Sequence, residues 1–158
     1  MAAIELDPID LKILAELQAD ARITNAELAD RVGLSASPCL RRVKRLEEAG
    51  VVAGYRAVFD RAAVGLGLTV FVDIKVGWHS RDNAQSLQDA LLGMPEVVAC
   101  YMLSGDTDFQ AEVVVADLAA YERFLTDKLL TLPMVEDIRS KLAIRMVKTD
   151  GPLPIRRR

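Results

Sequence analysis

The sequence predicts an α+β protein. An N-terminal winged helix-turn-helix of three helices is joined by a hairpin linker to a ferredoxin-like βαββαβ domain. Three observations predict this class: apolar residues recur at helical spacing before residue 50, strand-like and turn signals follow, and the charge changes sign along the chain. We place the helix-turn-helix at residues 1–50, the linker at 51–67, the second domain at 68–150 and a basic tail at 151–158.

Residues typical of helix ends predict where the first two helices begin and where the second ends. Asp7 followed by Pro8 is typical of an N-cap and a first helical position. Thr24 and Glu27 have the spacing of a capping box, in which each side chain accepts from the other residue's free backbone N–H. Gly33 ends the second helix, because glycine adopts the left-handed conformation of a helix C-terminus at little cost.

A third helix is expected from Ser35 or Ser37 to about Gly50, with Pro38 in its tolerant first turn. Leu40, Val43 and Leu46 are predicted to face the core. Ser35 to Leu46 holds four basic residues and no acidic one, so the other faces are basic. An ordinary packing helix with a solvated basic face is the alternative to a helix that enters the major groove of DNA.

Arginine can contact guanine through two hydrogen bonds, and serine can contact base edges or phosphates. The residues expected to bind double-stranded DNA are therefore Ser35, Ser37, Pro38, Cys39, Arg41, Arg42, Lys44 and Arg45. At Cys39 the start of a helix can lower the pKa of a thiol, which allows a redox role, although simple packing is the favoured interpretation.

The pattern changes after Gly50. Residues 51–60 are expected to form a short hairpin or an extended connector, and residues 61–67 a linker. The elements predicted next are a strand at 70–78, a helix at 83–92, a strand at 97–103, a tight loop at 104–108, a strand at 109–115, a helix at 117–130 and a strand at 138–147. Leu118, Tyr121, Leu125 and Leu129 are expected to point inward from the second of these helices.

The last strand carries apolar residues on both faces, because Leu142, Ile144 and Met146 alternate with Ala143 and Val147. The sheet face that the helices leave open would then suit a second sheet. We therefore expect a homodimer, which would also supply paired helices for a two-fold DNA site.

The composition limits the function. Among the 158 residues 51% are hydrophobic and 27% are charged, which excludes disorder for most of the chain. A net charge of −3 argues mildly against a nucleic-acid partner. The charges are segregated, however. Residues 31–56 carry six basic and two acidic side chains, whereas residues 82–127 carry one basic and nine acidic ones. The basic segment coincides with the proposed DNA-binding helix.

Other classes find little support. The two cysteines lie far apart, and with His79 as the single histidine no metal site is expected. No run of apolar residues is long enough for a membrane span, and residues 1–10 do not resemble a signal peptide. We expect a cytoplasmic protein with no cofactor and no catalytic residues.

The stretch from Leu6 to Arg45 resembles the N-terminal domain of the Lrp/AsnC family of bacterial and archaeal transcription regulators. The marks include Leu6-Asp7, Asp20-Ala21-Arg22, Val32-Gly33-Leu34-Ser35 and the arginine-rich run after Cys39. The resemblance continues through Gly54-Tyr55, Leu103 to Phe109 and Leu132-Pro133, and so covers nearly the whole chain. It implies a DNA-binding regulator whose activity or assembly responds to a small molecule, and the expected small molecule is an amino acid.

The resemblance also gives a role to the loop from Ser104 to Asp108, which from its residues alone is a turn with self-capping aspartates. In related regulators this loop lines a small-molecule site at a subunit interface. The resemblance implies effector contacts from Leu103, Ser104, Gly105, Asp106, Thr107, Asp108 and Leu142. Thr107 stands where the family frequently has an aromatic residue, so the identity of the amino acid stays open.

Family members pair sheet to sheet and often assemble to octamers, which the resemblance implies here as well. Two other functions are less favoured. Some haem-pathway decarboxylases resemble this family, but the acidic middle of this chain and its single histidine do not suit a polycarboxylate substrate. A sensing or assembly module with a vestigial helix-turn-helix is disfavoured by the intact basic helix.

Overall fold

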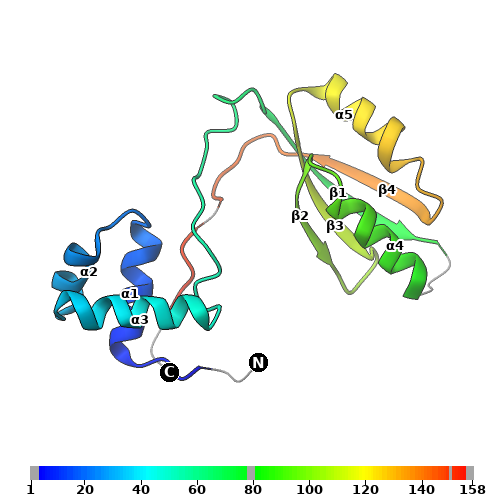
Figure 1. Cartoon of the computed structure of the whole chain (residues 1–158). Coiled ribbons are helices and arrows are strands. Elements are labelled where there is room, and N and C mark those ends of the chain that lie inside the picture. The colour runs from blue at the N-terminus through cyan, green and yellow to red at the C-terminus, as the bar shows by residue number, and fades with distance from the viewer. Residues whose placement is uncertain (1–3, 78–80, 150, 156–158) are drawn as a thin grey trace. The chain divides into compact units, whose positions relative to one another are not determined.

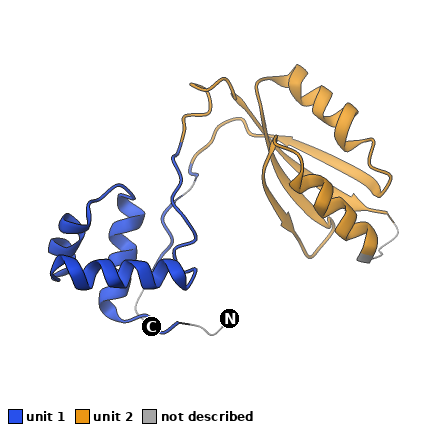
Figure 2. Cartoon of the chain, viewed as in Figure 1, with its two compact units in different colours: residues 1–58, 148–158 blue, residues 59–147 orange. Residues whose placement is uncertain are grey.

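The computed structural model describes residues 4–77, 81–149 and 151–155, and it divides the chain into two compact units (Figure 2). The first unit comprises residues 1–58 and 148–158, and the second comprises residues 59–147. Some residues named in the predictions lie outside the described residues. They are Trp78, at the end of the first predicted strand, the single histidine His79, and Arg156 to Arg158 of the basic tail.

The first unit contains three helices, α1 (Pro8–Ala19), α2 (Asn25–Val32) and α3 (Ala36–Glu48) (Figure 1). Asp7 caps α1 by accepting from the backbone N–H groups of residues 9 and 10. The capping box of Thr24 and Glu27 is formed in both directions, and Gly33 ends α2 with a φ of 76°. The helix boundaries predicted from these residues are therefore confirmed.

The core of this unit draws on all three helices. Its buried side chains are Ile13, Leu14, Leu28, Ala29, Val32, Cys39 and Leu46. One expectation was wrong: Leu40 is 43% exposed, and Cys39 takes the inward position instead. Both residues lie three or four positions from Val43, so helical spacing alone did not distinguish them.

The C-terminal segment returns to the first unit and packs on α1. The backbone of Leu153 forms two hydrogen bonds with the side-chain amide of Gln18, with N–H to Oε1 at 2.7 Å and Nε2 to O at 3.3 Å. Ile155 packs against the helical core. Residues 151–155 are thus held to the helices by hydrogen bonds with the Gln18 side chain and by an apolar contact.

The structure describes all of residues 51–67 and shows no strand among them. The segment is therefore the extended connector that was one of the two predictions, and not a hairpin. Tyr55 donates to the carboxylate of Glu47 at 2.8 Å, which ties the start of the linker to the end of α3. Asp60 caps the turn that follows by accepting from the N–H groups of residues 62 and 63.

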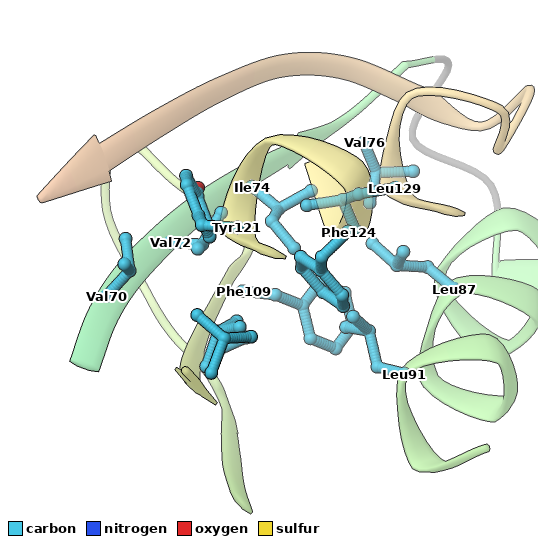
Figure 3. Close-up of a cluster of buried hydrophobic side chains, with 13 residues drawn as sticks. Val70, Val72, Ile74, Val76, Leu87, Leu91, Phe109, Tyr121, Phe124 and Leu129 are labelled. Carbon is cyan, nitrogen blue, oxygen red and sulfur yellow. The ribbon is translucent and has the colours of Figure 1, made fainter. Parts of the chain in front are cut away.

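The second unit has the predicted βαββαβ order. Its elements are β1 (Leu68–Val76), α4 (Arg81–Leu92), β2 (Val97–Met102), β3 (Phe109–Val115), α5 (Leu118–Phe124), a π-helical turn (Leu125–Leu129) and β4 (Val135–Leu142). The four strands form one antiparallel sheet in the order β2-β3-β1-β4. Both helices pack on the same face, where alternate residues of β1 and β3 meet side chains of α4 and α5 (Figure 3).

The core on that face is apolar, with one polar contact at its edge. The hydroxyl of Tyr121 lies 2.6 Å from the hydroxyl of Ser140, which satisfies both groups. Tyr121 and Leu129 are buried as predicted, and Leu125 is partly buried. Phe124, which was not predicted, is buried as well, whereas Leu118, directly after the cap residue Asp117, is 62% exposed. The inward assignment of Leu118 was therefore wrong, because the cap places the first turn of α5 at the surface.

The open face of the sheet is polar along β4, contrary to the expectation of apolar residues on both sides of the last strand, although Phe71 of β1 lies on the same face. Asp73 is nearly buried there and accepts from the amide of Gln110 at 2.9 Å and from the ammonium of Lys141. These two donors hold the pKa of Asp73 below its usual value. Arg61 donates to the Thr69 hydroxyl at 3.0 Å and to a neighbouring carboxylate on β3, which extends the polar network.

The last strand ends at Leu142, five residues earlier than predicted. Ala143 still donates to the carbonyl of Thr69, but β1 begins at Leu68 and offers no partner beyond that point. Ile144 and Val147 are therefore exposed and outside the sheet. The predicted strand was too long because apolar residues continue to alternate after Leu142, where β1 no longer offers a pairing partner.

Candidate DNA-binding and ligand-binding sites

The exposed face of α3 is built on a helix start that leaves its backbone donors available. Ser35 is the N-cap residue by position, but its side chain forms no capping hydrogen bond. The first N–H groups of a helix attract anions. Ser37, Arg41 and Lys44 follow at intervals of four and three, so they form one stripe along the helix, and all three are exposed.

The eight residues predicted to contact DNA are not equally placed. Ser35 is exposed like the residues of the stripe, and Pro38 is half-buried. Cys39 is fully buried in the core, which denies its side chain access to a nucleic acid and removes it from the predicted contact set. Burial also raises the pKa of the Cys39 thiol, which works against the reactive thiolate that a redox role needs.

The other two predicted residues, Arg42 and Arg45, are engaged by carboxylates of α1. One guanidinium nitrogen of Arg42 lies 2.6 Å from Asp7 Oδ2 and 2.8 Å from Asp10 Oδ1. Arg45 donates to the second oxygen of Asp10. The carboxylate of Asp10 also accepts from the backbone N–H of Asp7, so each of its oxygens has a partner.

Asp10 is completely buried, and two arginines of α3 neutralise it. A buried carboxylate is strongly destabilising without such partners. The backbone N–H of Asp10 and the guanidinium of Arg42 together lower the pKa of Asp7. The Asp7 and Asp10 carboxylates in turn raise the pKa of Arg42. The network therefore fixes the rotation of α3 and directs Arg41 and Lys44 away from α1.

Sequence reasoning missed the role of Asp10. The signal available was the Asp7-x-x-Asp10 spacing, which matches the capping-box pattern already used for Thr24 and Glu27. The ion pairs to α3 had no signal in the sequence, since they depend on how the two helices pack.

The predicted ligand loop is fastened to the sheet. Asp108 donates its N–H to the carbonyl of Ile74 at 3.1 Å, and its carboxylate accepts from the N–H of Val76 at 2.8 Å. Gly105 has a φ of 133°, a conformation that side chains rarely allow. This hydrogen bond of the Asp108 carboxylate is therefore with β1 and not with the loop's own backbone, as self-capping would require.

A cavity of about 610 Å³ opens beside this loop. It is lined by Lys75, Gly105, Asp106, Asp108, Glu136, Asp137 and Arg139. Three of the seven predicted ligand residues therefore line it, and Leu103, Ser104, Thr107 and Leu142 do not. Leu103 and Leu142 are exposed and do not line the cavity, so the described residues give it no apolar wall.

Four lining residues were not predicted, because they come from the pairing of β1 with β4. Lys75 lies opposite Asp137 in the register of these strands. Lys75 Nζ is 3.9 Å from Glu136 Oε2, and Arg139 Nε is 3.3 Å from Asp137 Oδ2. Four carboxylates thus share the cavity with two cations, which suits a ligand with an ammonium group and a carboxylate. Among the described residues no group of acidic, histidine or cysteine side chains is arranged for a metal.

Comparison with known proteins supports both sites at the level of domains. Residues 6–53 match the family described as winged helix-turn-helix DNA-binding, and residues 69–153 match the Lrp/AsnC ligand binding domain. The chain is 45% identical over 145 residues to the leucine-responsive regulatory protein of Rhizobium meliloti, covering 92% of this chain and 93% of the relative. It is 40% identical to the Bkd operon transcriptional regulator of Pseudomonas aeruginosa, with coverage of 96% and 99%.

Solved structures agree with the fold. A transcriptional regulator from Neisseria meningitidis, solved as a complex with L-methionine, has a TM-score of 0.90 and 38% identity, with coverage of 95% of this chain and 97% of that one. An AsnC family regulator from Agrobacterium tumefaciens has a TM-score of 0.89 and 38% identity, with coverage of 94% and 97%. Within the described residues, no helix has the length and apolar character to cross a membrane.

The role of Asp10 predicts a specific loss of stability. Replacing Asp10 with Asn leaves two guanidinium groups without their carboxylate, and we expect the free energy of unfolding of the first unit to fall by about 2 kcal/mol. Hydrogen–deuterium exchange of the full chain then shows amides of α1 and α3 exchanging about 30-fold faster. The matched control Asp30→Asn, at an exposed position of α2, leaves exchange unchanged. Unchanged protection in Asp10→Asn contradicts the assigned role.

Proposed function

Because this chain belongs to the Lrp/AsnC family of DNA-binding transcription regulators, we propose that an amino acid bound in its second unit controls DNA binding by the exposed face of α3. The family is one of regulators and not of enzymes, which sets aside the decarboxylase alternative. The observation that carries the proposal is the stripe of Ser37, Arg41 and Lys44, which α1 leaves exposed while it holds the neighbouring arginines.

The proposed DNA contacts divide into two kinds. Ser35 and the free N–H groups at the start of α3 are placed for a phosphate. Arg41 and Lys44 are placed for base edges or the opposite backbone. Arg42 and Arg45 act mainly by holding the helix, since Asp7 and Asp10 occupy them. This division keeps most of the original contact set and gives its members separate roles.

The contribution of Arg41 is testable in the full chain, with a duplex selected by the wild-type protein from random sequences. We expect Arg41→Ala to weaken binding about tenfold or more, because an exposed arginine contact is worth about 1–3 kcal/mol. Fluorescence anisotropy at several salt concentrations measures both the affinity and its salt dependence. Arg22→Ala, exposed outside α3, is the control and retains wild-type affinity. Equal affinities for Arg41→Ala and the wild type would exclude the proposed face.

The effector is proposed to be an amino acid bound beside the loop at Asp106. A carboxylate at the loop tip can pair with the ligand's ammonium group, and Lys75 or Arg139 can pair with its carboxylate. The relatives support this class, since one is named a leucine-responsive regulator and another was solved with L-methionine. Which amino acid this chain binds depends on what covers the open side of the cavity.

Binding at this cavity predicts a separable variant. Asp106→Ala removes the proposed partner of the ammonium group, so we expect affinity for L-leucine and L-methionine to fall at least tenfold at this site. DNA affinity without amino acid stays at the wild-type value, because Asp106 lies in the other unit. Calorimetry with Asp89→Ala as the control measures the first effect. Unchanged amino-acid affinity in Asp106→Ala means that the loop is only a turn.

Assembly into homodimers through the open sheet face, and from dimers to octamers, completes the proposal. Its support is the exposed Tyr101 of the edge strand β2, which lies opposite Gln110 on the open face, and the lack of apolar side chains among the described residues that line the cavity, which a second copy can supply. A regulator with two DNA-binding units also fits a two-fold DNA site, and such binding places the protein in the cytoplasm.

Sedimentation velocity tests the assembly. A particle of at least twice the 17.3 kDa of one chain is expected at micromolar concentration. A particle with the mass of a single chain at all concentrations contradicts the proposal.

A further inference from the structure

A second cavity, of about 440 Å³, lies at the other end of β3 from the loop of Asp106. It opens where β3 ends at Val115 and α5 begins, and it is bounded by Leu66 from the segment before β1 and Phe124 from α5. This volume falls in the range of small-molecule sites, which is about 300–1,000 Å³. Unlike the cavity beside Asp106, it has an apolar wall supplied by the same chain.

Glu96, one of the residues that line this cavity, has a buried acceptor. Glu96 binds the ammonium of Lys128 through Oε1 at 2.6 Å, but its Oε2 is buried and has no hydrogen-bond partner among the described residues. Burial acts to raise the pKa of Glu96, and the Lys128 ammonium outweighs it, so the pKa lies below its usual value. Glu96 therefore has one buried carboxylate oxygen whose hydrogen-bonding capacity is not satisfied by the described residues.

A break in helix geometry occurs at the same place. Residues Leu125–Leu129 form a π-helical turn, in which Thr126 donates its hydroxyl to the carbonyl of Glu122 at 2.9 Å. π-helical turns are rare overall, but those that occur are often found at functional sites, where the extra residue redirects side chains. Here the turn brings Lys128 to Glu96 and places Asp127 on the cavity wall. Arg123, one turn earlier, adds an exposed cation to the rim.

We propose that this cavity is a second ligand site, for an apolar α-amino acid. Oε2 of Glu96 accepts from the ligand's ammonium group, and the guanidinium of Arg123 binds its carboxylate. The apolar side chain lies against Leu66, Val115 and Phe124. The ligand class rests on the proposed function, whereas the location, residues and apolar wall are independent of the loop at Asp106.

The two sites share β3 as a common element. The first precedes Phe109 and the second follows Val115, so the seven-residue strand separates them by roughly 20 Å. That distance excludes one ligand from bridging both sites. Any effect of one on the other passes through the sheet and is reciprocal in its effect on affinity.

Equilibrium dialysis of the full chain with L-leucine, and separately with L-methionine, tests the site by stoichiometry. Wild-type protein is expected to bind two molecules per chain, and Glu96→Gln and Asp106→Ala one each, because each variant weakens its own site at least tenfold. Glu122→Gln, at an exposed position of α5, is the matched control and binds two. N-acetyl-L-leucine, which lacks the ammonium group, is expected to leave the second site empty.

Arg123→Ala tests the same site if Glu96→Gln fails to fold. Arg123 is exposed, and its replacement leaves the ion pair of Glu96 and Lys128 in place. It is expected to weaken the second site about tenfold with an unchanged melting temperature.

The outcomes separate the two proposals. One molecule per wild-type chain, lost in Asp106→Ala, overturns the second site and leaves the proposed function standing. One molecule that is lost in Glu96→Gln but kept in Asp106→Ala upholds the second site and overturns the first. No binding of either amino acid overturns both. Two molecules that remain in both Glu96→Gln and Arg123→Ala overturn the residues assigned to the second site.

Discussion

The buried carboxylate of Asp10 and the two arginines that neutralise it determine how α3 lies on α1. A fully buried charge has no low-energy alternative to these partners, so the rotation of α3 about its axis is tightly constrained. Cys39 and Leu46 consequently point into the core, and Arg41 and Lys44 point to solvent. An interaction inside one unit thereby decides which basic side chains are exposed on the face of α3 that we propose binds DNA.

In the second unit, hydrogen-bond donors likewise hold some carboxylates in place, whereas other carboxylate oxygens have no such partner among the described residues. Asp73 is held on the open sheet face by Gln110 and Lys141, and Asp108 is fastened to the backbone of β1. Each carboxylate that is fully engaged in this way supports the fold, whereas Asp106 and one oxygen of Glu96 are the groups that we propose bind a ligand. The distinction between structural and binding carboxylates therefore lies in their hydrogen bonds and not in their sequence context.

Much of the fold could be predicted from the sequence, because its signals are local. The caps at Asp7 and Thr24, the turn at Gly33 and the alternation of the strands predicted every helix and strand of the βαββαβ order and the three helices before it. The errors arose where the deciding partner is distant. Leu40 and Cys39 are equivalent in periodicity, and the end of β4 depends on where β1 begins.

The candidate sites were predictable only in part for the same reason. The stripe on α3 could be proposed from residues close in sequence, whereas the loop at Asp106 received a binding role only from the family resemblance. Lys75 and Arg139 reach the cavity through strand register, and the capture of Arg42 and Arg45 by α1 depends on helix packing. Neither kind of information is contained in a single sequence read by spacing and charge.

The most direct test of this account is a high-resolution structure of the full chain bound to a DNA duplex that it selects. The account predicts that Arg41 and Lys44 lie within hydrogen-bond distance of bases or phosphates while Arg42 and Arg45 remain on the carboxylates of Asp7 and Asp10. A complex in which Arg42 and Arg45 leave Asp10 and contact the bases would contradict it.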